Sequence, residues 1–269
     1  MDKREKILSL FSLDGRVAIV TGGAGRLGVK HCEILHDAGA TVISFDVVTN
    51  DALVGIADQE KVDIRNLDEV RKAVAEVTQK HGRVDILINN AALNPRGSKT
   101  ATGDDLLQFK PYEEYSPEMW EKEIAVGLTG AEFVTQAVAP YMMKQQSGCI
   151  LNIASTSAIT APNHSKYEEG KFKSVAYPTI KTALLGLTRA WASYFAATSP
   201  GIRVNSVSFG AIDFGSQEKG SVLKSSSVNM LGRKARGDEY QGVILFLCSD
   251  ASSFVNASNV VVDGGQTAW

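Results

Sequence analysis

The chain has 269 residues, of which 44% are hydrophobic and 22% are charged, with a formal net charge of −2. This composition fits one large globular domain, and the near-neutral charge gives no electrostatic reason to expect a nucleic-acid or membrane partner. No apolar run approaches the roughly 20 residues of a membrane-spanning helix, so we expect a cytoplasmic protein that acts on a small molecule. Its three cysteines are widely spaced, which predicts reduced structural thiols and no metal site.

Residues 3–13 combine charges with a short apolar stretch, and we expect them to form an amphipathic cap on the body rather than a signal peptide. Strand-like apolar runs then alternate with helix patterns. The expected strands are 16–21, 41–46, 61–64, 84–91, 148–155, 201–208 and 259–264, and the expected helices lie near 26–38, 66–81, 117–145, 174–197 and 237–248. This alternation predicts an α/β fold with a parallel sheet covered by helices on both faces. We expect a single domain over 1–269, with residues 1–14 as an N-terminal extension.

A glycine-rich turn, "TGGAGRLG" at 21–28, follows the first expected strand and leads into a helix pattern. Glycines permit a tight turn and a close approach of the backbone to a pyrophosphate, which the N–H groups at the start of the helix bind. The strand before and the helix after make this a prediction of a dinucleotide site. The expected cofactor contacts in the turn are Gly22, Gly25, Arg26, Leu27 and Gly28.

The second expected strand ends at Asp46, 21 residues beyond Gly25. That spacing is typical of the carboxylate that binds the adenosine ribose, and a carboxylate there repels a 2′-phosphate. The sequence therefore favours NAD over NADP, against the simpler interpretation that Asp46 only starts a turn. Arg26 keeps NADP open, because a guanidinium at the helix start can meet either the pyrophosphate or a 2′-phosphate.

Two long polar stretches, 92–116 and 209–236, each follow the carboxyl end of an expected strand. Open α/β sheets bind their ligands at that end, and long loops inside compact domains are usually functional or mobile. We expect the substrate site there, with 209–236 as a substrate lid. Arg96 and Lys99 would suit a phosphate or carboxylate, although exposed basic residues are more often simply solubilising.

Tyr177 and Lys181 stand four residues apart in "SVAYPTIKTALLG". Residues at this spacing share a helix face, and Pro178 belongs in a first turn, so Tyr177 is expected at the helix entrance. A Tyr-x-x-x-Lys pair alone is more often a solvent-facing pair. Ser155, at the end of an upstream apolar strand, favours a catalytic interpretation.

Five motifs in order carry a family resemblance: the turn at 21–28, "NNAA" at 89–92, "NIAS" ending at Ser155, the Tyr177–Lys181 pair, and "VVVDGG" at 260–265. From about Gly15 to its end the chain resembles the compact, single-domain short-chain dehydrogenases/reductases. The resemblance implies a doubly wound Rossmann-type sheet of about seven parallel strands. It also implies NAD(P)-dependent hydride transfer involving a secondary alcohol or ketone, and a homodimer or homotetramer.

The resemblance further implies the role of each site residue. Ser155 would orient the substrate, Tyr177 would be the general acid/base, and Lys181 would hold the nicotinamide ribose and lower the pKa of the tyrosine. Ionising a phenol near pH 7 requires about 4 kcal/mol, and one cation at about 4 Å contributes on that order. The other implied cofactor contacts are Asp63, Ile64, Asn90, Ala91, Gly210 and Ile212.

Three departures from the family pattern keep alternatives open. Arg26 replaces a usual glycine and gives the spacing of the family's nucleotide-sugar branch, which leaves an epimerase or dehydratase open. Gly127 replaces the asparagine that holds a relay water, and Phe209 replaces a proline, which we expect to loosen the loop beside the nicotinamide. Both leave open a catalytically silent dinucleotide-binding regulatory or scaffold protein.

The chain also resembles, in several short motifs, a subgroup linked to bacterial surface-polysaccharide and flagellin-sugar modification, which would imply a sugar-like substrate. The charged run 166–173, which contains Lys173, is expected either to shape a polar pocket or to be a solvated surface. The helices near 117–145 and 174–197 are apolar on several faces, so we expect them to pack against another copy of the chain.

Overall fold

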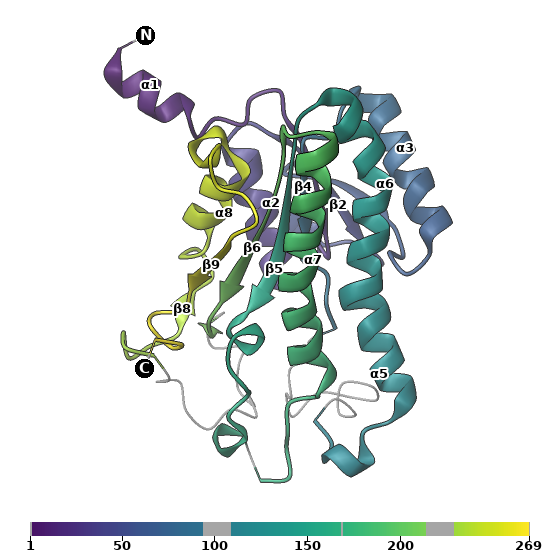
Figure 1. Ribbon diagram of the computed structural model, residues 1–269, viewed down its shortest axis with the longest axis vertical. Coiled ribbons are helices and arrows are strands. Elements are labelled where there is room, and N and C mark those ends of the chain that lie inside the picture. The colour runs from purple at the N-terminus through teal and green to yellow at the C-terminus, as the bar shows by residue number, and fades with distance from the viewer. Residues whose placement is uncertain (1, 94–108, 168, 214–228, 269) are drawn as a thin grey trace.

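The computed structural model describes residues 2–93, 109–167, 169–213 and 229–268 (Figure 1). Seven parallel strands form the central sheet in the order β3-β2-β1-β4-β5-β6-β9. The strands are β1 Val17–Thr21, β2 Thr41–Asp46, β3 Asp58–Lys61, β4 Ile86–Asn89, β5 Gly148–Ser155, β6 Ile202–Phe209 and β9 Asn259–Val262. The order reverses direction between β1 and β4, as in a doubly wound Rossmann sheet, so the predicted fold is confirmed.

Helices cover both faces of this sheet and create two separate cores. On one face lie α3 (Leu67–His81), α6 (Gly130–Gln145) and α7 (Ala176–Thr198), and on the other lie α2 (Arg26–Asp37) and α8 (Gln241–Cys248). Each strand in the middle of the sheet is therefore buried on both sides, which explains its uninterrupted apolar sequence. All three cysteines are buried and free.

The third strand lies earlier in the chain than the sequence indicated. It was expected at 61–64, but β3 is Asp58–Lys61, and its four residues are polar. It pairs with β2 alone at the edge of the sheet, where two-sided burial is not required. The apolar residues Val62 and Ile64 follow the strand and are buried in the connection to α3. Their alternation with polar residues resembles that of a strand, which explains the misplaced prediction.

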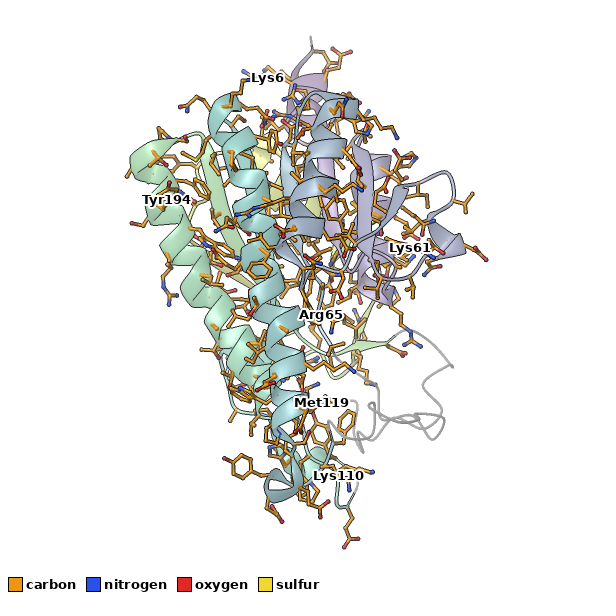
Figure 2. All side chains as sticks on the ribbon, turned by 90° about the vertical axis from the view of Figure 1, so that its right-hand side faces the viewer. Lys6, Lys61, Arg65, Lys110, Met119 and Tyr194 are labelled. Carbon is orange, nitrogen blue, oxygen red and sulfur yellow. The ribbon has the colours of Figure 1, made fainter. Side chains whose placement is uncertain are left out.

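The helix expected at 117–145 is interrupted by a π-helical segment. It consists of α5 (Pro117–Ile124), the π-helix Ala125–Thr129 and α6. Gly127 in the π segment is buried against Ile180 of α7, where an added Cβ would lie 2.9 Å from Cγ2 of Ile180. Figure 2 shows the α5–α6 pair beside α7, with Met119 and Tyr194 toward opposite ends.

The N-terminal helix α1 (Lys3–Ser9) does not cap the body, contrary to expectation. Asp2 and Glu5 form a capping box at its start, but none of its residues is buried. Ile7 and Leu8 are each 60% exposed, and α1 projects from the molecule (Figure 1). The first buried residue is Leu13, because the chain joins the core only where it approaches β1.

A two-stranded parallel pair, β7 (Ile212–Asp213) and β8 (Ala235–Arg236), stands apart from the main sheet. Both strands lie within the predicted lid, 209–236, whose residues 214–228, like Arg96 and Lys99 of the earlier loop, lie outside the described residues. The remaining short helical turns are Asp51–Leu53, Tyr112–Glu114, Thr156–Ala158, His164–Lys166 and Asp250–Ser252. Within the described ranges, no helix is long and apolar enough to cross a membrane.

Candidate active site

The carboxyl ends of the central strands bring the predicted site residues to one edge of the sheet. The glycine turn follows β1, Asp46 ends β2, and Asn90 follows β4. Ser155, the last residue of β5, stands beside Phe209, the last residue of β6, in the strand register. In an open α/β sheet, ligands bind at this edge where the strand order reverses.

The glycine turn is shaped by close approach of the chain to itself. Gly22 has φ +63°, and a Cβ on it would lie 2.8 Å from Cα of Ala91. A Cβ on Gly28 would overlap the carbonyl oxygen of Gly22. At the N-cap of α2, Gly25 provides no side-chain hydrogen bond, so the N–H groups of the first turn face outward without a side-chain cap. These features fit the pyrophosphate of a dinucleotide.

Thr21, at the end of β1, and Asn90, which follows the neighbouring strand β4, brace the turn together. The Thr21 hydroxyl accepts hydrogen bonds from the backbone N–H groups of Asn90 (3.0 Å) and Ala91 (3.1 Å). The Asn90 amide donates to the carbonyl oxygens of Thr21 (2.9 Å) and Gly22 (3.0 Å). Asn90 was predicted to line the cofactor, and the structure gives its side chain this bracing role. Thr21 was missed, because a lone threonine in a strand carries no sequence signal.

The two acidic residues predicted to bind the adenosine end differ in their surroundings. The carboxylate of Asp46 accepts hydrogen bonds from the backbone N–H groups of Ala24 (3.1 Å) and Val48 (3.3 Å), which places it directly beside the glycine turn. The Nε–H of Arg65 instead donates to both carboxylate oxygens of Asp63, at 2.9 and 3.0 Å, and this pairing lowers the pKa of Asp63. Ile64 is buried against Gly130 at the start of α6.

Phe209 is packed into the core at the expected nicotinamide end of the site. Its ring is buried and stacks on Tyr240, with ring centroids 4.1 Å apart and an interplanar angle of 21°. The next residue, Gly210, donates its N–H to Val262 at 3.1 Å, and a Cβ on it would lie 2.9 Å from Cα of Asp263. Aromatic packing thus holds Phe209 at the position of the usual proline, while residues 214–228 of the following loop lie outside the described residues. Ile212 then begins β7.

Ser155, Tyr177 and Lys181 converge from two elements. Tyr177 and Pro178 lie in the first turn of α7, which confirms the predicted helix entrance. Ser155 is 8% exposed, and its hydroxyl lies close enough to the Tyr177 phenol to lower the pKa of that phenol. Lys181 is 4% exposed, its Nζ donates to the carbonyl oxygen of Ile153 at 2.6 Å, and it lies 5.7 Å from the centre of the Tyr177 ring.

Burial acts against the ionised forms of both side chains. It raises the pKa of Tyr177, and the nearby Ser155 hydroxyl opposes this rise only in part. It lowers the pKa of Lys181 to about 8, so the ammonium form still prevails at neutral pH. A phenolate at Tyr177 therefore depends on nearby positive charge to offset its desolvation.

A second group of charged residues beside Tyr177 was not singled out by the sequence. The Nζ atom of Lys173 lies 3.8 Å from the centre of the Tyr177 ring. Glu123 of α5 is 1% exposed and accepts hydrogen bonds from the hydroxyls of Tyr115 (2.6 Å) and Ser174 (2.8 Å). Lys173 was visible only as part of a charged run. The sequence did not indicate Glu123, because its hydrogen-bond partner Ser174 lies 51 residues further along the chain.

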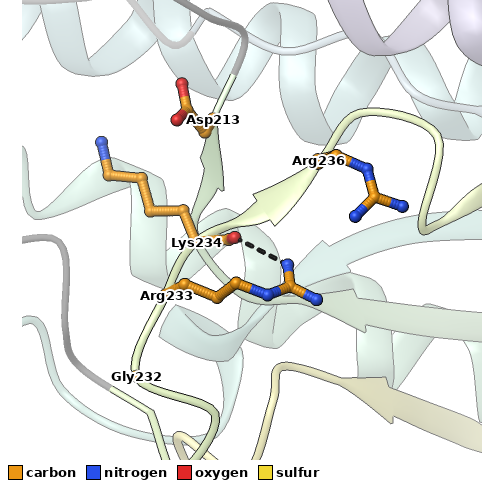
Figure 3. A pocket seen from close by; sticks show the side chains of 5 residues that line it. All are labelled: Asp213, Gly232, Arg233, Lys234 and Arg236. Atoms are coloured by element: carbon orange, nitrogen blue, oxygen red, sulfur yellow. Dashed lines mark hydrogen bonds between the residues drawn. The ribbon is translucent and has the colours of Figure 1, made fainter.

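A pocket of about 340 Å³ opens beside β7 and β8, within the predicted lid 209–236 (Figure 3). It is lined by Asp213, Gly232, Arg233, Lys234 and Arg236. Arg233 donates to the carboxylate of Glu239 at 2.6 Å and to the carbonyl oxygen of Lys234 at 3.1 Å, so its charge is already matched by an acid. In the described part of the chain, no cluster of three histidine, cysteine or acidic side chains could hold a metal ion.

Residues 23–267 match the protein family described as enoyl-(acyl carrier protein) reductase. The chain is 33% identical over 265 residues to 3-oxoacyl-(acyl-carrier-protein) reductase FabG of Thermotoga maritima, covering 94% of this chain and 98% of the relative. A gluconate 5-dehydrogenase from Burkholderia cenocepacia in complex with NADP and tartrate superimposes with a TM-score of 0.80, 28% identity, and coverage of 98% and 99%. An NAD+-bound xylitol dehydrogenase gives a TM-score of 0.78 at 26% identity, with coverage of 94% and 99%.

Proposed function

The chain belongs to the short-chain dehydrogenase/reductase family of NAD(P)-dependent oxidoreductases, and we propose that it interconverts a secondary alcohol and a ketone on a polar, sugar-like substrate. The observation that supports this most is the convergence of the Ser155, Tyr177 and Lys181 side chains at the carboxyl end of β5. Two of the similar solved structures are named for a sugar acid and a polyol, which supports a polyhydroxylated substrate.

The three side chains divide the work of proton transfer. In the oxidative direction the Tyr177 phenolate takes the proton of the substrate hydroxyl, and in the reductive direction the phenol returns it. Ser155 hydrogen-bonds to the same substrate oxygen and fixes its position. The ammonium of Lys181 favours the phenolate electrostatically. The nicotinamide, when bound, accepts or donates the hydride.

Gly127 makes a proton route through an asparagine at that position impossible. The ammonium of Lys181 contacts the carbonyl oxygen of Ile153 directly, and we propose that protons reach solvent from Lys181 through backbone groups and ordered water. This route changes how the proton leaves the site but keeps the same reaction.

For the cofactor, we propose NAD. The carboxylate of Asp46 lies beside the glycine turn, held by the N–H groups of Ala24 and Val48, where a 2′-phosphate would meet a negative charge. We further propose a cytoplasmic homodimer or homotetramer that serves carbohydrate metabolism.

A second candidate is the reduction of a 3-oxoacyl thioester. Its support is the 33% identity to the Thermotoga reductase over nearly the whole of both chains. The same three side chains would protonate the 3-oxo group, so the two candidates differ in substrate and not in chemistry.

The test is a spectrophotometric assay of nicotinamide reduction or oxidation. The substrates are sugars, sugar acids and polyols, with an acetoacetyl thioester as a separate arm. We expect turnover with a polyhydroxylated substrate and a loss of about 10²–10⁴-fold in Tyr177→Phe, which loses its general acid/base. Tyr194→Phe is the matched control, because Tyr194 lies on the same helix and is 56% exposed.

Three other outcomes of this assay would each contradict the proposed function in a different way. Full activity in Tyr177→Phe would refute the assigned acid/base. Tight dinucleotide binding without turnover on any substrate would identify a silent regulatory or scaffold protein. Cofactor that stays bound through purification and is not consumed would identify an epimerase or dehydratase.

A further inference from the structure

Lys173 is closer to the Tyr177 ring than the lysine already assigned to the site. Its Nζ atom lies 3.8 Å from the ring centre, compared with 5.7 Å for Nζ of Lys181. Both distances are within the range of about 6 Å over which an ammonium is attracted to the face of an aromatic ring. Two cations therefore act on one phenol.

Glu123 supplies the opposite charge for Lys173. Burial and the nearby Lys181 lower the pKa of Lys173 to about 8, and the carboxylate of Glu123 opposes this shift. The Ser174 hydroxyl donates to Glu123 at 2.8 Å and accepts from the backbone N–H of Tyr177 at 3.3 Å. Glu123 therefore both keeps Lys173 protonated and ties the segment that carries it to the start of α7.

The other titratable groups around Tyr177 are neutral or more remote. Burial raises the pKa of Tyr167 to about 12, and burial together with Glu123 raises the pKa of Tyr115. His164 accepts a hydrogen bond from the backbone N–H of Lys173 at its Nδ1 (3.4 Å), and its ring lies 5.9 Å from that of Tyr167. Among the described residues, the ammonium groups within about 6 Å of the Tyr177 ring centre are those of Lys173 and Lys181. Burial raises the pKa of Glu123, and the hydrogen bonds from Tyr115 and Ser174 together with the charge of Lys173 oppose that rise.

We propose that Lys173, with Glu123 as its counter-charge, is a positioning residue that holds a second ammonium against the ring of Tyr177 and favours its phenolate form. A cation near the ring stabilises the negatively charged phenolate more than the neutral phenol. This role deepens the proposed function, since it matters for turnover only if Tyr177 is the acid/base. The ionisation of Tyr177 itself can be measured without any substrate.

The experiment compares a positively charged side chain with a neutral one at position 173. Lys173→Cys is alkylated either with 2-bromoethylamine, which restores an ammonium, or with iodoacetamide, which leaves a neutral side chain. The native cysteines are all buried, which directs alkylation to the new thiol. Tyrosinate absorbance is then titrated against pH, and the same titration in a Tyr177→Phe background is subtracted to isolate Tyr177.

We expect Tyr177 to titrate at higher pH in the neutral adduct than in the ammonium adduct, which should match the wild type. The reason is that an ammonium and a phenolate in contact each favour the charged form of the other, so the ammonium is retained while the phenolate forms. Lys171→Cys, treated in the same way, is the control, and its two adducts should titrate alike. Equal midpoints for the two adducts at position 173, or a lower midpoint for the neutral one, would overturn the proposal. Lys173→Met and Lys173→Arg repeat the comparison without alkylation and should behave as the neutral and charged forms, respectively.

Turnover provides an independent readout. If the enzyme oxidises an alcohol, the acid limb of its kcat profile should move upward by the same amount in Lys173→Met and return in Lys173→Arg. A shifted tyrosine titration without turnover on any substrate would leave the ionic role intact while refuting the proposed reaction.

Discussion

Individual side chains at the carboxyl edge of the sheet do two kinds of work. Thr21 and Asn90 hold the glycine turn against β4 through hydrogen bonds whose donors and acceptors all belong to the protein. Asp46 and Ser155 each accept backbone N–H bonds and still present oxygen atoms at the ends of their strands. Residues of the second kind are the ones whose substitution should change specificity or rate without unfolding the protein.

Asp46→Asn should move the cofactor preference toward NADP. The amide keeps an oxygen for the N–H of Ala24 but removes the negative charge that repels a 2′-phosphate. We expect the ratio of the Kd values for NADP and NAD to fall by about tenfold to a hundredfold. Fluorescence titration with each dinucleotide measures this directly.

Asp51→Asn is the control for that comparison, because Asp51 is an exposed carboxylate five residues along the same connection. It should leave both dissociation constants unchanged. A wild type that already binds NADP more tightly than NAD would contradict the role given to Asp46.

At the level of secondary-structure elements, the π segment lets two long helices approach each other. Gly127 has no side chain, so Ile180 of α7 packs directly against the backbone of Ala125–Thr129. Ile180 is one residue before Lys181, and the contact therefore supports the turn of α7 that carries both site residues. A π-helical bulge of this kind frequently occurs near a functional site.

Gly127→Ala should lower the free energy of unfolding by about 1–3 kcal/mol, because its Cβ would lie 2.9 Å from Cγ2 of Ile180 in a packed core. Urea denaturation measures the change. Gly242→Ala in α8 is the control, since an added Cβ there meets nothing within 4 Å, and alanine should be neutral or stabilising by up to about 1 kcal/mol. The cost of Gly127→Ala should shrink in an Ile180→Ala background, and strict additivity would contradict the proposed contact.

At the level of the whole molecule, apolar surface remains uncovered on several elements. Phe254 is fully exposed, Val261 of β9 is 43% exposed, and Tyr194 on α7 is 56% exposed. The outer face of α7 also carries Ala190, which is exposed although its neighbour along the helix, Trp191, is partly buried. Contact with a second copy of the chain would remove such apolar side chains from water, which is the physical basis of the proposed self-association.

Ala190→Glu should shift the sedimentation coefficient toward a smaller species than the proposed dimer or tetramer, because it places a charge on the outer face of α7. Ala75→Glu is the matched control, because Ala75 is an exposed alanine on α3, on the far side of α6 from α7. A wild type that sediments as a monomer at every concentration would contradict the proposed assembly.

The features that could be predicted from the amino-acid sequence are those that depend on residues close together in the chain. Two-sided apolar runs marked the interior strands, the glycine spacing marked the turn after β1, and the Tyr177–Lys181 spacing with Pro178 marked the entrance of α7. Each of these follows from local geometry, so a short window of sequence contains all of the information that it needs.

Features that depend on contacts between segments far apart in the sequence became visible only in the tertiary structure. The polar strand β3 forms by pairing with β2, Phe209 becomes rigid by stacking on Tyr240, and Lys173 reaches Tyr177 with a counter-charge from α5. The physical reason is the same in each case. Burial, pairing and electrostatic partners are properties of neighbours in space, and no local pattern of residues records which neighbours folding will supply.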